Sequence, residues 1–109
     1  MGKAERTIQD ACMEYLGMHP KVAFVHTTTT GTLPIGAGGK RRYIKVGYPG
    51  MGDIVGMLKD GRFLSVETKQ PGEIPTQDQY DFIDMVSKRG FAFWVDSLEE
   101  CMMLAGDLF

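Results

Sequence analysis

The amino-acid sequence predicts an α/β fold in which a mixed β-sheet is flanked by helices. Three observations support this class: stretches with helical periodicity, stretches rich in β-branched and aromatic residues, and a strand reached from a hairpin through a helix. The predicted order of elements is α-β-β-β-α-β-α. Residues 1–109 are expected to form a single domain, because 43% hydrophobic residues in a chain of this length suffice for one core.

The first helix is predicted over residues 4–18. Apolar side chains from Ile8 to Tyr15 recur at helical spacing there, and Gly17 is expected to close the helix. The strand that follows is predicted over residues 21–28, which are rich in β-branched and aromatic residues.

The middle of the chain is predicted to contain a long loop and a β-hairpin. Residues 29–42 hold four glycines and one proline and are expected to form a flexible loop. Residues 43–46 have the composition of a short strand. The segments 53–58 and 62–69 flank Lys59-Asp60-Gly61, which is typical of a three-residue hairpin connection with glycine in the left-handed position.

The last third of the chain is predicted to alternate between helix and strand. Residues 77–89 are expected to be helical, with Gly90 at the C-terminal end. Residues 91–95 form a short apolar run typical of a buried strand. Ser97 and Glu100 match a capping box at the start of a final short helix.

The hairpin register predicts that two carboxylates meet. A three-residue loop sets Asp53 opposite Glu67, and strand alternation places Lys69 on the same face as Glu67. Like charges facing each other across strands are destabilising, so the pair implies either a raised pKa or a bound cation. Oxygen ligands favour magnesium, manganese or calcium. In the alternative interpretation, Asp53 lies in the preceding turn and Glu67 pairs with Lys69 or another base.

The net charge of −2 conceals an uneven distribution. No acidic residue lies between Glu14 and Asp53, and this stretch carries a charge of +5 against −7 for the remainder. Basic clusters attract polyanions, although a solvated loop can have the same composition. The basic residues expected to contact nucleic-acid phosphates are Lys40, Arg41, Arg42 and Lys45.

Composition also narrows the cellular setting. No apolar run is long enough to span a membrane, and no apolar segment typical of a signal peptide follows the N-terminus. Cys12 and Cys101 stand far apart and form no CxxC pair, which argues against a zinc knuckle or redox motif. A reduced cytoplasmic setting without membrane partners is therefore expected.

Several short motifs together resemble one nuclease family. Gly50-Met51-Gly52-Asp53 followed by Val66-Glu67-Thr68-Lys69 resembles the PD-(D/E)XK nuclease signature, and more narrowly the VRR-NUC family of virus-type replication-repair nucleases. The other matching motifs are Glu5-x-x-Ile8-Gln9, the Pro-Gly-x-x-Asp turn Tyr48-Pro49-Gly50-Met51-Gly52-Asp53, Gly61-Arg62-Phe63, Thr76-x-x-Gln79 and Gly90-Phe91-Ala92-Phe93. Their order and spacing run from Glu5 to about Leu104. The departure is Gly52, which stands where proline precedes the aspartate in the superfamily signature.

The resemblance implies a restriction-endonuclease-like core and a DNA endonuclease that uses Mg²⁺ or Mn²⁺. It makes Asp53, Glu67 and the backbone carbonyl of Thr68 the metal ligands. Lys69 would either orient the attacking water or stabilise charge on the phosphorane. It also implies a homodimer that cuts branched or four-way-junction DNA in replication, repair or recombination, encoded by a phage or bacterium and acting in the host cytoplasm.

Two further site residues have structural alternatives. Gln79 heads an inward helix face and is expected at the site, yet Thr76-x-x-Gln79 is also a capping box. Glu5 is expected to accept a hydrogen bond from a metal-bound water or to bind the metal itself. An acid in the first helical turn is, however, also favoured by the helix dipole. Two other functions stay open: a non-catalytic DNA-binding module, and a nuclease that acts on RNA or single strands.

Overall fold

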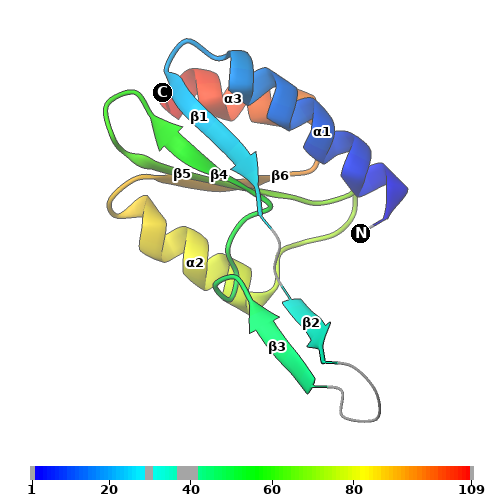
Figure 1. Cartoon of the computed structure of the whole chain (residues 1–109). Coiled ribbons are helices and arrows are strands. Elements are labelled where there is room, and N and C mark those ends of the chain that lie inside the picture. The colour runs from blue at the N-terminus through cyan, green and yellow to red at the C-terminus, as the bar shows by residue number, and fades with distance from the viewer. Residues whose placement is uncertain (1, 29–30, 37–41, 109) are drawn as a thin grey trace.

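The chain folds into a mixed four-stranded sheet with helices on both faces (Figure 1). This computed structural model describes residues 2–28, 31–36 and 42–108. The elements follow one another as α1 (Lys3–Met18), β1 (Val22–Thr27), β2 (Gly31–Ile35), β3 (Arg42–Val46), β4 (Ile54–Leu58), β5 (Phe63–Thr68), α2 (Gln77–Ser87), β6 (Phe91–Val95) and α3 (Leu98–Leu108).

The main sheet has the strand order β1-β4-β5-β6. Its first three strands are antiparallel to one another in turn, whereas β5 and β6 are parallel and are connected through α2. Helices α1 and α3 contact each other and cover one face, while α2 packs against β5 and β6 on the other face (Figure 1). The predicted α/β class with a mixed, helix-flanked sheet is therefore confirmed. The predicted order α-β-β-β-α-β-α is wrong, because the described residues place five strands, not three, between α1 and α2.

The predicted loop over residues 29–42 is wrong in part, because β2 and β3 pair there as a separate antiparallel ribbon. The ribbon extends away from the main sheet (Figure 1). Four glycines and Pro34 suggested a loop, but each strand of a two-stranded ribbon has an unpaired edge that tolerates proline. The structure thus has β2 in the predicted loop, and β3 begins at Arg42, one residue before the predicted short strand.

Helix boundaries differ slightly from the prediction. Helix α1 continues through Gly17 and ends at Met18, with His19 in an extended conformation as its C-cap. Helix α2 ends at Ser87 rather than at residue 89. Helix α3 begins as predicted after Ser97, whose hydroxyl accepts a hydrogen bond from the amide of Glu100 at 3.1 Å.

The predicted hairpin register is confirmed. Ile54 lies opposite Val66 and Met57 opposite Phe63, which continues the same register to Asp53 and Glu67. Gly61 has φ +93°, the left-handed conformation that the three-residue loop requires, and its amide donates to Leu58 O at 2.9 Å. Turn chemistry therefore determines which residue of β4 faces which residue of β5.

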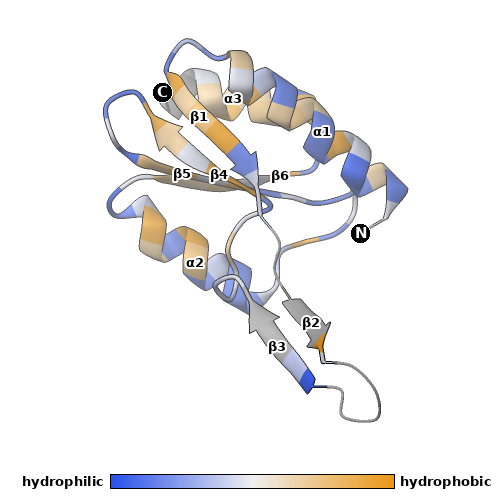
Figure 2. Cartoon of the chain, viewed as in Figure 1, coloured by the Kyte–Doolittle hydropathy of each residue, from blue (hydrophilic) through white to orange (hydrophobic). Residues whose placement is uncertain are grey.

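The core lies between the sheet and the helices α1 and α3. Leu64 and Val66 on β5 are fully buried there together with Cys12 and Leu16 of α1. Figure 2 shows hydrophobic residues along the strands of the main sheet and alternating hydrophobic and hydrophilic residues along α1 and α2. The alternate residues Ser65 and Glu67 then face α2, so a carboxylate is buried in the opposite layer.

Candidate metal centre

Three carboxylates from distant parts of the chain converge at one end of the sheet. Glu5 lies in the first turn of α1, Asp53 immediately precedes β4, and Glu67 lies near the end of β5. Each offers one oxygen atom, and these oxygens all lie within 4.8 Å of one another. Glu67 is buried, whereas Glu5 and Asp53 are half-buried, so the cluster is open to solvent on one side.

The Asp53 carboxylate is held by the strand that carries Glu67. Its Oδ2 atom accepts hydrogen bonds from the Thr68 amide at 3.0 Å and from the Thr68 hydroxyl at 2.8 Å. The backbone carbonyl of Asp53 accepts a bond from the amide of Thr28 at 2.8 Å. Asp53 is thus fixed through both its main chain and its side chain, and none of these three hydrogen bonds involves Oδ1.

The Glu67 side chain is only 3% exposed, and its two oxygens have different surroundings. Oε1 accepts a hydrogen bond from Gln79 Nε2 at 2.9 Å and lies 3.6 Å from Lys69 Nζ. Oε2 is buried and has no hydrogen-bond partner among the described residues. A buried carboxylate oxygen without a donor is costly unless a proton or a cation accompanies it.

Electrostatics within the cluster favour that additional positive charge. Burial and the neighbouring charge of Asp53 raise the pKa of Glu67 to about 8, although Lys69 opposes the shift. Burial and the charge of Asp53 also raise the pKa of Glu5. Both shifts have the direction expected when carboxylates share a site without a cation.

The residues present fit a metal ion. Three carboxylates within reach of one another form a hard, oxygen-only donor set, and one of them is Glu67, whose Oε2 has no partner among the described residues. The cluster can therefore hold a metal ion. The predicted pairing of Asp53 and Glu67 accords with this geometry, and Asp53 does lie in the turn before the strand, as the alternative held.

Gln79 satisfies both of its predicted interpretations at once. Its side-chain Oε1 accepts a hydrogen bond from the Thr76 backbone amide at 2.8 Å. The Gln79 backbone amide donates to Thr76 Oγ1 at 3.3 Å, which completes the capping box of α2. Its Nε2 donates to Glu67 Oε1. Because an amide has both a donor and an acceptor end, the two roles are compatible.

The turn before Asp53 is fitted closely against β5. The amide of Gly52 donates to Ser65 Oγ at 3.2 Å, and its carbonyl accepts from Thr28 Oγ1 at 2.7 Å. A Cβ atom on Gly52 would stand 2.5 Å from Ser65 Oγ and 2.8 Å from the Val66 carbonyl oxygen. Glycine therefore fits this position because the turn approaches the strand so closely.

We expect Gly52→Ala to lower the free energy of unfolding by about 1–3 kcal/mol, because the added methyl group must displace backbone atoms. Gly106→Ala is the matched control: a Cβ on Gly106 meets no atom within 4 Å, so this change in α3 is expected to be neutral or slightly stabilising. Urea unfolding of the two variants measures the difference. Equal stabilities would contradict the close packing of this turn.

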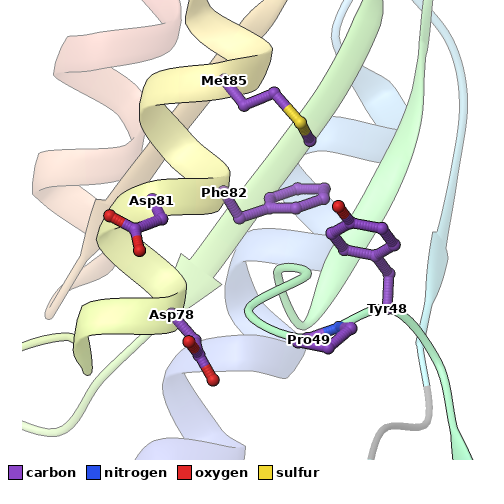
Figure 3. A pocket seen from close by; sticks show the side chains of 6 residues that line it. All are labelled: Tyr48, Pro49, Asp78, Asp81, Phe82 and Met85. Carbon is purple, nitrogen blue, oxygen red and sulfur yellow. The ribbon is translucent and has the colours of Figure 1, made fainter.

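Aromatic packing joins the same turn to α2. The rings of Tyr48 and Phe82 lie 5.7 Å apart between centroids. They border a pocket of about 380 Å³ whose other lining residues are Pro49, Asp78, Asp81 and Met85 (Figure 3). In Figure 3 the Phe82 ring points from α2 toward Tyr48, with Pro49 below it. None of the three clustered carboxylates lines this pocket. The contact between Tyr48 and Phe82 joins α2 to the turn and so helps to position the site.

The predicted basic residues are placed only in part. Arg42 is exposed at the start of β3, and Lys45 lies opposite Thr32 in the ribbon. Lys40 and Arg41 lie outside the described residues. The predicted coordinating role of the Thr68 carbonyl stays a prediction.

Sequence reasoning missed the contacts that hold the site in place. These are the two Thr68 bonds to Asp53, and the bonds of Ser65 and Thr28 to the Gly52 backbone. Strand alternation puts Ser65 on the same face as Glu67, which could have drawn attention to it. Nothing in the sequence around Thr28 indicates its partner across the sheet.

None of the helices in the described part of the chain is both long and apolar enough to cross a membrane. Comparisons of the chain with protein-family models, with curated proteins and with solved structures find no match.

Proposed function

We propose that this protein is a metal-dependent DNA endonuclease of the PD-(D/E)XK type, similar to VRR-NUC nucleases, that hydrolyses phosphodiester bonds with Mg²⁺ or Mn²⁺. The observation that carries the proposal is the buried, unpartnered Oε2 of Glu67 in a cluster with Asp53 and Glu5, beside Lys69. The motif resemblance supplies the reaction, and the cluster supplies the donor set that such a reaction requires.

Each residue has a separate task in this proposal. Asp53 and Glu67 bind the cation, with the Thr68 carbonyl as a further ligand and Glu5 at the open side of the cluster. A bound cation would polarise the phosphodiester and neutralise charge that develops on it. Lys69 is 9% exposed and presents its ammonium group beside Glu67, where it can orient the attacking water or stabilise the charged transition state.

Branched DNA is the proposed substrate class, four-way junctions included, and the proposed assembly is a homodimer acting in the cytoplasm of a bacterial or phage-infected cell. These points rest on the family resemblance. A symmetric pair of cuts requires two active sites related by a two-fold axis, which a homodimer provides.

A cleavage panel tests the proposal. It presents four-way junctions, flaps, linear duplex, single-stranded DNA and RNA, each with Mg²⁺, with Mn²⁺ or with chelator. We expect metal-dependent cleavage, with branched DNA cut fastest. Uniform inactivity together with retained DNA binding would instead indicate a non-catalytic DNA-binding module. Preference for RNA or single strands would redirect the substrate assignment.

DNA affinity is expected to depend on the basic residues of the stretch from Lys40 to Lys45. Replacing Lys40, Arg41, Arg42 and Lys45 with alanine should weaken binding and flatten the slope of log affinity against log salt by up to about 0.9 per lost phosphate contact. Fluorescence anisotropy with Asp53→Asn protein and no metal measures this without cleavage.

A control variant replaces Lys88 and Arg89, two exposed basic residues that directly follow α2. This end of α2 lies away from the ribbon (Figure 1). Their loss should leave the salt slope within about one phosphate contact of the parent protein. An equal effect of both variants would show that overall charge, and not the stretch from Lys40 to Lys45, determines DNA affinity.

A further inference from the structure

We infer that Gln79 is a positioning residue that restricts Glu67 to one coordinating oxygen and thereby favours Mg²⁺ over Ca²⁺. The inference rests on the metal site of the proposed function. Gln79 holds the proposed metal ligand Glu67, and the helix cap of α2 in turn fixes Gln79.

The helix cap determines which end of the Gln79 amide faces the site. The backbone amide of Thr76 is a donor, so the atom of Gln79 that lies 2.8 Å from it must be the carbonyl oxygen. The NH₂ group is therefore turned the other way, where Nε2 stands 2.9 Å from Glu67 Oε1. A rotated amide would place oxygen against oxygen at Glu67 and a donor against a donor at Thr76.

This arrangement leaves Glu67 with one oxygen for a cation. Oε1 is engaged by Gln79 Nε2 and lies 3.6 Å from the Lys69 ammonium group, whereas Oε2 has no partner among the described residues. Asp53 is divided in the same way, because two Thr68 donors engage its Oδ2. Each carboxylate can then coordinate through one oxygen while the other remains bonded to the protein.

One-oxygen coordination distinguishes the two cations. Ca²⁺ takes about 6–8 oxygen ligands and readily accepts both oxygens of one carboxylate, whereas Mg²⁺ takes an octahedral set that includes several waters and only one or two carboxylates. Holding Glu67 Oε1 on Gln79 disfavours the two-oxygen mode that a larger cation uses, because Oε1 would have to turn away from its donor. The same hydrogen bond orients Oε2, and outer partners of this kind typically change metal affinity about 10–100-fold.

Calorimetric titration of the full chain with MgCl₂ and, separately, with CaCl₂ tests the inference without any measurement of cleavage. In Gln79→Met, which lacks the amide, Mg²⁺ affinity should fall about tenfold and Ca²⁺ affinity should hold or rise. In Gln79→Glu, which keeps the capping box, the preference for Mg²⁺ should fall by a similar factor, because the donor to Glu67 is replaced by an acceptor.

Thr76→Ala is the matched control. It removes the hydroxyl that accepts a hydrogen bond from the Gln79 backbone amide. It keeps the Thr76 backbone N–H that fixes Gln79 Oε1. We expect a lower melting temperature from the weakened cap and an unchanged ratio of the two affinities.

The outcomes separate the inference from the function on which it depends. If the native protein binds Mg²⁺ and the ratio of affinities is unchanged in both Gln79 variants, or if Thr76→Ala shifts it equally, the role of Gln79 is wrong and the metal site stands. If the native protein binds neither cation, the proposed function fails, and the inference fails with it.

Discussion

Asp53→Asn and Glu67→Gln are each expected to reduce metal-dependent DNA cleavage by at least about 10³-fold. A catalytic cation supplies several kcal/mol of transition-state stabilisation, and about 1.4 kcal/mol corresponds to a factor of ten in rate. Both substitutions preserve the shape of the side chain while removing the charge that binds the cation. In particular, the side-chain oxygen that Asp53→Asn retains can still accept from the Thr68 amide, as Asp53 Oδ2 does.

DNA binding should survive in both variants, because none of the basic residues proposed to contact phosphates is replaced in them. Single-turnover cleavage of a labelled junction and anisotropy at matched salt measure the two properties separately. Asp84→Asn is the matched control: Asp84 lies on α2, is 77% exposed and pairs with Lys88 at 3.6 Å. Its cleavage rate should equal that of the native protein. Cleavage at the native rate by either site variant would overturn the assignment of the metal centre.

Glu67→Gln is also expected to stabilise the fold at alkaline pH in the absence of metal. The pKa of Glu67 is about 8 in the folded state, against 4.5 for an ordinary glutamate. Between these values the folded state holds a proton that the unfolded state has released, so stability falls as pH rises through this window and levels off above it. The loss amounts to at most about 5 kcal/mol.

Glutamine imitates the protonated carboxyl at every pH. Its Oε1 can take the donors from Gln79 and Lys69, while its NH₂ group occupies the position of Oε2 and can donate toward Asp53. The variant should therefore match the native protein near pH 5 and exceed its free energy of unfolding by about 2–5 kcal/mol at pH 9. Urea denaturation with chelator at about pH 5, 7 and 9 provides the comparison.

Two controls accompany this measurement. Glu99→Gln alters an exposed acid on α3 and should shift stability little at any pH. Saturating Mg²⁺ should stabilise the native protein and not Glu67→Gln, which narrows the difference at alkaline pH. Parallel stability profiles of the native protein and Glu67→Gln across this pH range would contradict the raised pKa of Glu67.

In this proposal, the site lowers the free energy of unfolding as long as no cation is bound. A buried carboxylate with an unpartnered oxygen is unfavourable in the metal-free protein, and a bound cation would reverse that cost. In this proposal, Glu67→Gln both stabilises the metal-free fold at alkaline pH and strongly reduces cleavage.

The sequence by itself determined the pairing at the centre of this site. The three-residue turn that ends in Gly61 set the register between β4 and β5, and the two-residue period of a strand then placed Glu67 beside Lys69 and opposite Asp53. These are local relations, in which turn length and alternation follow directly from neighbouring residues. The helical periods at residues 4–18 and 77–89 were predictable for the same reason.

Only the tertiary structure decided what surrounds that pair. Packing of α1 and α2 against opposite faces of the sheet brought Glu5 and Gln79 to the two carboxylates, and burial between these layers raised the pKa of Glu67. The pairing of β2 with β3 in a glycine-rich segment likewise required the structure. Such contacts join residues distant in the chain, and they depend on packing and desolvation that no short sequence window contains.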